Sequence, residues 1–435
     1  MLAAATGTAL LPLHGGRVPP WLSARMARLG RVIVEAIAHE YGRTEVLRRL
    51  SSPFWFQCFG AVMGMDWHSS GITTSVIGAL KRGLGPVEHE LGLHVCGGRG
   101  RHSRRTPDEL TALGERLGLD APALVRASRS VAKVDSAAVQ DGFDLYLHGF
   151  IVADDGAWVV VQQGMNGERR QARRYHWIWD RVSAAQTAGA GAAFVEEPHA
   201  AIEGRPGGEI VNLVDRRAAG ARAEVAVLAR RGPDATVDQL AQLRMPAHHD
   251  VRAEDIDLAR LGRTLAAVAE RGPEDFTELL LTPGIGARTL FSLALVAEVI
   301  HGTPSRFADP ARFSLAHGGK DGHPFPVPLR VYDETISVLK RAVAAAKLGE
   351  GERLAAIARL DEQARIIDSE AAAPAVQPAD FDRWVAAEKA AKTVLGGRTV
   401  ADDAAARRKR RAMQLDFPFG SSSLSSVSAW RRGSG

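Results

Sequence analysis

Apolar positions recur at helical spacing in the first part of the chain. Between Pro20 and Leu50 they fall at three- and four-residue steps, as on one face of an amphipathic helix. From residue 53 to 105 the pattern breaks into short apolar pieces, and it ends in a Gly- and Arg-rich stretch, residues 96–105, that we expect to form a loop. A capping-box pattern beginning at Thr106 then predicts another helix. The first region is therefore predicted to be largely helical.

A different pattern follows in the middle of the chain. Residues 143–152 and 157–163 are rich in β-branched and aromatic side chains, and Asp154-Asp155-Gly156 lies between them. This combination predicts a β-hairpin. Residues 187–244 show weak periodicity and indicate connecting structure with a short strand near residues 210–214.

The pattern is helical again from residue 255 to about 396. Breaks are expected at residues 272–273, at Pro283, and over residues 302–328 and 349–351. The residues after 396 are rich in Ser, Gly and Arg, which predicts a disordered basic tail.

These patterns predict an α+β protein. It has a helical N-terminal region with a small β-hairpin-containing core, followed by an all-α domain. The expected units are residues 1–245, the candidate catalytic core, residues 246–396, the helical domain, and residues 397–435, the tail.

Composition narrows the class of protein. The chain has 435 residues, 46% of them hydrophobic and 24% charged, which is enough to bury a sizeable core. Two cysteines are too few for a disulfide framework or a four-cysteine zinc site, and they indicate a reducing compartment. The N-terminus lacks the basic start of a signal peptide, and no apolar run is long enough for a membrane span. We therefore expect a cytoplasmic protein without a membrane partner. The net charge of +5 is a weak indication of a polyanionic partner.

The most informative motif lies between residues 276 and 295. Two helical patterns flank Pro283-Gly284-Ile285-Gly286, and the arrangement resembles a helix-hairpin-helix, the element that holds DNA backbones in many repair enzymes. The two glycines permit a tight turn, and Ile285 is expected to plug the core beneath it. The second helix would begin with free N–H groups, with Arg288 and Thr289 in its first turn as further donors to a phosphate. An ordinary tight turn between packed helices is the alternative.

A glycine-rich stretch follows the motif, with Lys320 and Asp321 between glycines. Lys320 is a further candidate DNA contact. A helix-hairpin-helix followed by a lysine or aspartate also resembles base-excision glycosylases, although prolines and glycines occupy the intervening segment where those enzymes continue as helix. A loop packed on the hairpin is the alternative to a glycosylase site.

The predicted hairpin presents candidate metal ligands. Asp135, Asp141 and His148 lie before and within it, and Gln163 lies on its return strand. Such oxygen and imidazole groups suit Mg²⁺ or Mn²⁺, which nucleases use to activate water. Strand alternation predicts that Asp144, Tyr146 and His148 share one face. The four residues named first are our candidate catalytic set, and structural roles in turns are the alternative for each.

Arginine clusters supply candidate phosphate contacts. Arg101 and Arg104 lie in the Gly-rich stretch, and Arg173 and Arg174 precede Tyr175, His176 and Trp177. A second cluster of possible ligands, whose spacing matches no zinc pattern, is Asp66, His68, His94, Cys96 and His102.

A short peptide in the tail resembles the motif by which bacterial repair proteins dock on the sliding clamp. Gln414, Phe417 and Phe419 occupy its anchor positions, although Phe417 replaces the usual leucine. Docking of these side chains on the protein's own surface is the alternative.

Four segments together give a family resemblance. They are Leu11–Pro19 (LPLHGGRVP) with the preceding Thr6-Gly7-Thr8, Gly64–Gly71 (GMDWHSSG), Gln162–Asn166 (QQGMN) and Ala316–Gly322 (AHGGKDG). Over residues 5–370 the chain resembles the prokaryotic family known as domain of unknown function 763. That resemblance implies no reaction, so function is argued from the chemistry of the residues.

The sequence favours a DNA-binding protein of repair or recombination that hydrolyses phosphodiester bonds with a bound Mg²⁺ or Mn²⁺. A DNA-binding protein without catalytic activity is the first alternative, and a helix-hairpin-helix glycosylase is the second.

Overall fold

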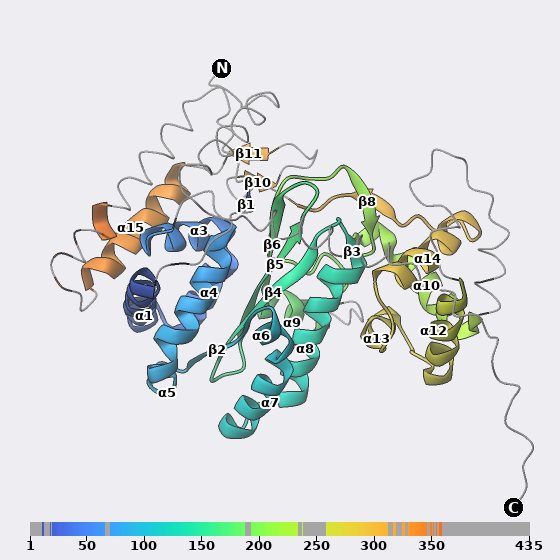
Figure 1. Ribbon diagram of the computed structural model, residues 1–435, viewed down its shortest axis with the longest axis horizontal. Coiled ribbons are helices and arrows are strands. Elements are labelled where there is room, and N and C mark those ends of the chain that lie inside the picture. Colours follow the sequence, from blue (N-terminus) through green and yellow to red (C-terminus); the bar gives the residue numbers. More distant parts are fainter. Residues whose placement is uncertain are drawn as a thin grey trace, which may run out of the picture.

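The computed structural model describes residues 20–65, 70–187, 193–233 and 258–311, with shorter pieces at 11–12, 18, 237, 316–318, 324–326, 329–345 and between 349 and 358. Its centre is a six-stranded antiparallel sheet (Figure 1). The strand order is β1-β6-β5-β4-β2, and β7 also pairs with β6. These strands are β1 (Leu11–Pro12), β2 (Leu93–Arg99), β4 (Asp144–Ala153), β5 (Trp158–Asn166), β6 (Gln171–Ile178) and β7 (Ala201–Glu203).

The predicted β-hairpin is confirmed as β4 and β5. Val152 pairs with Trp158 across the turn, and Gly156 in that turn has a φ of +83°. An Asp-Gly turn with the glycine at positive φ joins two antiparallel strands with little strain, which explains why a local pattern predicted this element.

Helices cover one face of the sheet, on the left in Figure 1. They are α1 (Pro20–Tyr41), α2 (Arg43–Ser51), α3 (Pro53–Val62), α4 (Gly71–Leu84) and α15 (Leu329–Ala345). The helix predicted from Pro20 to Leu50 is split at Gly42, which has a φ of +86°. Apolar side chains of these helices form one buried cluster with the strand residues on this face of the sheet, Leu147, Ile151, Val159 and Val161.

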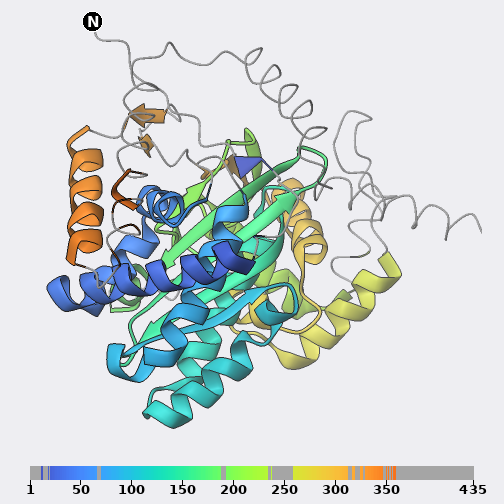
Figure 2. The same ribbon diagram turned by 60° about the vertical axis from the view of Figure 1, so that its left-hand side comes forward.

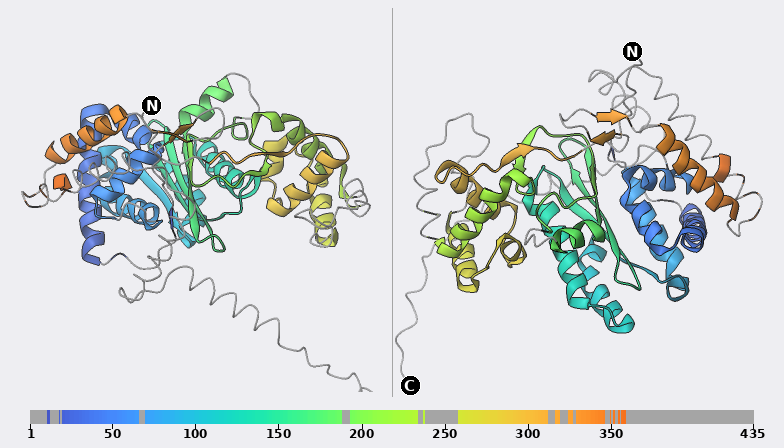
Figure 3. Two further views of the ribbon diagram at one scale, coloured as in Figure 1. Left: turned by 90° about the horizontal axis from the view of Figure 1, so that it is seen from above. Right: turned by 180° about the vertical axis from the view of Figure 1, so that it is seen from behind.

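The opposite face packs on a second set of helices, seen well when the molecule is turned (Figures 2 and 3). They are α6 (Arg101–Arg104), α7 (Thr106–Leu117), α8 (Ala121–Lys133), the π-helical turn η2 (Val134–Ala138) and α9 (Trp179–Thr187). The strand positions on this side, Phe150, Val160, Tyr175 and Trp177, belong to a cluster separate from the first. The sheet therefore divides two hydrophobic cores.

The second core continues into the C-terminal helices. These are α10 (Ala219–Arg231), α12 (Leu258–Arg271), α13 (Phe276–Leu281) and α14 (Ala287–Val299). A three-stranded sheet of β3 (Val139–Gln140), β8 (Glu209–Asn212) and β9 (Arg306–Ala308) connects both parts, and β10 (Ala316–Gly318) pairs with β11 (Pro324–Pro326). The short strand expected near residue 210 and the helix break at residues 272–273 are both present. The boundary expected near residue 246 lies outside the described residues.

The predicted loop at residues 96–105 is wrong. Residues 93–99 form β2, which pairs with β4 from Leu93↔Ala153 to Arg99↔Leu147, and residues 101–104 form α6. Gly97 and Gly98 adopt φ values of +82° and +134°, so these glycines allow an irregular strand to stay paired. The partner strand is about 50 residues away in sequence, so no local pattern indicated the pairing.

The predicted capping box at Thr106 is also not formed, although the helix itself begins there. The Thr106 hydroxyl donates to the Ser103 carbonyl at 2.9 Å. Glu109 instead accepts hydrogen bonds from the Gly97 amide and from Lys81, both at 2.7 Å. Glu109 therefore fastens α7 to β2 and α4.

None of the helices in the described part of the chain combines the length and apolar character that crossing a bilayer requires. The predicted tail, residues 397–435, lies outside the described residues.

Candidate functional site

The turn between α13 and α14 is built by local sequence. Asp275 caps α13 by accepting from the Glu278 amide at 2.8 Å. After α13 ends, the Ile285 amide donates to the Thr282 carbonyl at 3.2 Å, and Gly284 has a φ of +91°. Proline at the second position and a positive-φ glycine at the third are the residues of a type II turn. The two predicted helices and their tight turn are therefore present.

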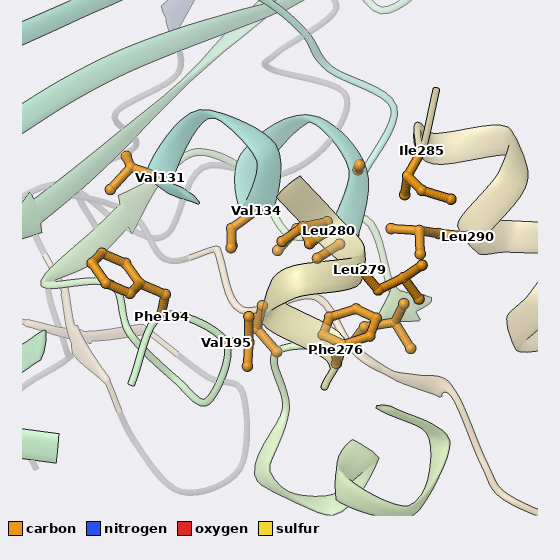
Figure 4. Packing of buried hydrophobic residues seen from close by; sticks show 14 of the residues in the cluster. Val131, Val134, Phe194, Val195, Phe276, Leu279, Leu280, Ile285 and Leu290 are labelled. Carbon is orange, nitrogen blue, oxygen red and sulfur yellow. The ribbon is translucent and has the colours of Figure 1, made fainter. Parts of the chain in front are cut away.

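Ile285 anchors this turn from below. Its side chain is 1% exposed and lies in the same cluster as Leu279, Leu280 and Leu290, as Figure 4 shows. Val134 of η2 belongs to that cluster too, so the turn is seated on the main core. The predicted plug is confirmed.

The other side of the turn is open. Pro283 and Gly284 are exposed, and Gly286, with a φ of −144°, precedes α14 without a side-chain cap. The first backbone bond of α14 runs from the Leu290 amide to the Gly286 carbonyl at 3.0 Å, so the amides of residues 287–289 precede it. Arg288 is exposed and Thr289 is half-buried. A helix start of this kind offers N–H donors and a positive dipole end to an anion.

Two side chains from distant sequence fix the turn to the body of the protein. Lys133, at the end of α8, donates from Nζ to the Ile285 carbonyl, and Gln140 donates from Nε2 to the Ala287 carbonyl at 2.9 Å. Burial lowers the pKa of Lys133. Sequence patterns gave no signal for either contact, because each partner lies about 150 residues away.

Helix α12 adds charge beside the turn. The Thr264 methyl group lies 3.4 Å from the point where a Cβ on Gly284 would stand. Arg260 and Arg263, which are exposed, lie within the same turn of α12 as Thr264. Helix α12 therefore passes beside the turn at Thr264, and Arg288 of α14 is the exposed arginine in the first turn after it.

The candidate catalytic residues belong to buried networks instead. On the α8 side of the sheet, His148 donates from Nδ1 to Gln162 Oε1 at 2.6 Å and accepts from the Ser128 hydroxyl at 2.9 Å. Gln162 donates to Asp135, which also accepts from Trp177 Nε1 at 2.9 Å and from His199. Burial lowers the pKa of His148, so the ring stays neutral near pH 7.

A second network surrounds Arg173. The guanidinium donates to Asp141 at 2.8 Å, and two of its nitrogens donate to Asp309 at 3.1 and 2.8 Å. Tyr175 donates to Asp141 at 2.7 Å. Burial disfavours the charge on Arg173, but Asp141 and Asp309 outweigh that effect and raise the pKa of the guanidinium. This network joins β6 to the segment after β9.

A third network lies on the α4 side of the sheet. Arg174 donates to Glu203 and to Gln57, the latter at 2.9 Å. Gln163 accepts from Thr73 and donates to the Ser70 carbonyl, that second bond being 2.8 Å long. Gln163 therefore lies on the opposite face of the sheet from His148.

The structure contradicts the predicted convergence of Asp135, Asp141, His148 and Gln163. Asp135 and His148 belong to the first network, Asp141 to the second and Gln163 to the third. The prediction that Asp144, Tyr146 and His148 share one face of the strand is also wrong, because the pairing register shifts between Leu145 and Leu147. Among the described residues no group of three or more His, Cys, Asp or Glu side chains is arranged to hold a metal ion. The oxygens of Asp135 and Asp141 and both nitrogens of His148 already bond to protein groups, so these residues do not fit Mg²⁺ or Mn²⁺.

The predicted DNA contacts at Arg173 and Arg174 are also contradicted. Both side chains are 0% exposed and form buried ion pairs, so they are unavailable to a phosphate. The prediction rested on the charge of these side chains alone. It was wrong because Arg173 and Arg174 lie in a strand that is covered on both faces. By contrast, Arg101 and Arg104 on α6 are exposed.

The remaining candidates lie partly within and partly outside the described residues. His94 is 1% exposed and donates to Asp154 at 2.7 Å, and burial raises the pKa of Cys96 to about 12. Lys320, Asp66 and His68 lie outside the described residues. So do Gln414, Phe417 and Phe419, and clamp docking stays a prediction from the sequence.

The fold and the site define an α+β protein with a two-core sheet and an exposed, firmly seated turn between two helices. The chain belongs to the family described as protein of unknown function (DUF763), whose model matches residues 7–327. No curated protein and no solved structure matches the chain.

Proposed function

We propose that this protein binds the sugar–phosphate backbone of duplex DNA through the α13–α14 turn, in repair or recombination. The observation that supports the proposal is the combination of a buried Ile285 with an exposed Pro283 and Gly284. The core holds the turn in one conformation, while its outer side offers backbone amides to a ligand. Because little order has to be gained on binding, the amides are ready for a phosphate.

The surrounding charge favours an anionic ligand, and a phosphate is such a ligand. Arg288 adds charge in the first turn of α14, and α12, which carries the exposed Arg263, passes beside the turn at Thr264. Contacts from amides and arginines to phosphates position a protein on a duplex without reading its sequence. Non-sequence-specific holding of DNA is compatible with a role in repair or recombination.

Hydrolysis is not part of this proposal. The residues that the sequence assigned to a metal-dependent nuclease, Asp135, Asp141, His148 and Gln163, are buried and bonded within the sheet networks. The structure therefore favours the interpretation as a DNA-binding protein, and the lysine and aspartate of the glycosylase alternative lie outside the described residues.

The test is binding of a fluorescent duplex to the full chain, followed by anisotropy over a range of salt concentrations. Arg288→Glu is expected to weaken binding about tenfold, because it removes one phosphate contact and adds repulsion at the same place. Arg271→Glu is the matched control: it makes the same charge change on an exposed arginine about 10 Å further along α12 from Thr264. Equal affinity of Arg288→Glu and the wild-type protein for DNA would overturn the proposal.

A further inference from the structure

Helix α8 presents a basic stripe to solvent. Arg126 and Arg129 are exposed, and Lys133 follows one turn later on the same face. The opposite face of the helix, with Leu124, Ala127, Ser128 and Val131, is buried against the sheet. The stripe is therefore a surface feature of a helix that is held firmly in place.

The stripe arginines are not neutralised by neighbouring acids. Elsewhere on the surface, Arg43 pairs with Asp154 and Arg116 pairs with Glu88. In the part of the chain that the structure describes, Arg126 and Arg129 form no ion pair, and the exposed Asp108 and Glu115 of the adjacent α7 pair with neither. Their charge is available to an anionic partner.

The stripe runs directly to the α13–α14 turn. Lys133 ends it and donates to the Ile285 carbonyl, and α13 packs on α8 (Figure 1). Arg126 and Lys133 are seven residues apart, about 10 Å along the helix, and one DNA strand rises about 3.4 Å per nucleotide. The stripe therefore matches roughly three nucleotides of one strand beyond the phosphate at the turn.

Helix α6 continues the basic surface. His148 of β4 pairs with Gly98 in β2 and bonds to Ser128 of α8, so the end of β2 and the middle of α8 are neighbours. Immediately after β2, the exposed Arg101 and Arg104 lie on α6. Helix α6 also packs on α7, and α7 packs on α8, so these three helices adjoin one another in that order.

We propose that Arg126 and Arg129, together with Arg101 and Arg104, form a second phosphate-contacting surface that holds the duplex along α8. The proposal rests on the proposed function, since it extends the path of a duplex already held at the α13–α14 turn. It assigns the α8 arginines a binding role that the sequence patterns did not suggest, because their helical spacing is also that of an ordinary solvated face.

The experiment compares the salt dependence of duplex binding between the wild-type chain and paired variants. Each phosphate contact contributes about 0.9 to the slope of log K against log salt, so Arg126→Ala with Arg129→Ala should reduce the magnitude of that slope by about 1.8. Affinity at low salt should fall about tenfold or more. Arg126→Lys with Arg129→Lys retains the charge and should retain most of the slope.

The matched control is Arg25→Ala with Arg28→Ala. These arginines have the same spacing on α1, which lies across the sheet from α8 (Figure 1). An unchanged slope in the α8 variant, or an equal reduction in the control, would overturn this inference. If Arg288→Glu still weakened binding in that case, the proposed function would stand, whereas a wild-type chain that binds no duplex DNA would overturn both.

Discussion

At the scale of single residues, Arg173 connects parts of the protein that are distant in sequence. It bonds to Asp141 before β4, to Asp309 after β9 and to the Arg205 carbonyl at 2.6 Å. Arg173→Leu would leave two buried carboxylates without their cation. Removal of one partner from a buried charge network costs about 3–5 kcal/mol, so we expect a loss of that size in the free energy of unfolding. Urea denaturation followed by tryptophan fluorescence measures it.

Arg205→Ala is the control for this substitution. Arg173 contacts only the backbone carbonyl of Arg205, whose side chain is exposed, so the variant keeps the hydrogen bond and should unfold like the wild-type protein. A loss of less than about 1 kcal/mol in Arg173→Leu would show that the network contributes little beyond its packing.

Single residues also show which contacts could not be predicted from the sequence. Arg173 and Arg174 precede an aromatic run, and this pattern is shared by a nucleic-acid surface and by a buried strand whose arginines are paired. The partners that decide between the two, Asp141, Glu203 and Asp309, lie 29 to 136 residues away. Those pairs can be identified only from the tertiary fold. From the sequence alone, Asp135 and Asp141 were therefore interpreted as metal ligands.

At the scale of elements, the α13–α14 turn depends on two glycines in different ways. Gly284 has a φ of +91°, whereas Gly286 is extended and has open space at its Cβ position. Gly284→Ala should lower the free energy of unfolding by about 1–2 kcal/mol, because an L-residue is strained in the left-handed region. Gly286→Ser should leave stability unchanged or raise it slightly, since serine is a good N-cap. Denaturant titration of both variants checks this contrast.

Equal losses from both glycine variants would contradict that account of the turn. The sequence did predict the turn and its plug, because glycine, proline and a flanked isoleucine act within a few residues of one another. It failed for β2, where the paired residues of β4 lie about 50 positions away. Elements specified by local chemistry were therefore predictable, whereas edge strands specified by their partners were not.

At the scale of the whole molecule, two buried histidines hold helices to opposite faces of the central sheet. His176 of β6 bonds to the Leu50 carbonyl of α2 at 3.0 Å, and His148 of β4 bonds to Ser128 of α8. Burial lowers the pKa of both rings, and Arg174 lowers that of His176 further. Both layers are therefore joined to the sheet through groups that are neutral in the folded protein.

This arrangement predicts a loss of stability in mild acid. Unfolded histidine takes up a proton near pH 6.5, whereas His148 and His176 in the folded protein do so only at lower pH. Below about pH 6.5 the unfolded state therefore binds more protons, and the free energy of unfolding falls as pH falls, by up to about 1.4 kcal/mol per pH unit for each histidine.

Urea denaturation between pH 7.5 and 5.5, values spanning about one unit on either side of that pKa, measures the slope. His176→Gln should reduce the slope relative to the wild-type protein. Identical slopes for wild type and His176→Gln would mean that protonation of this ring does not govern the acid response.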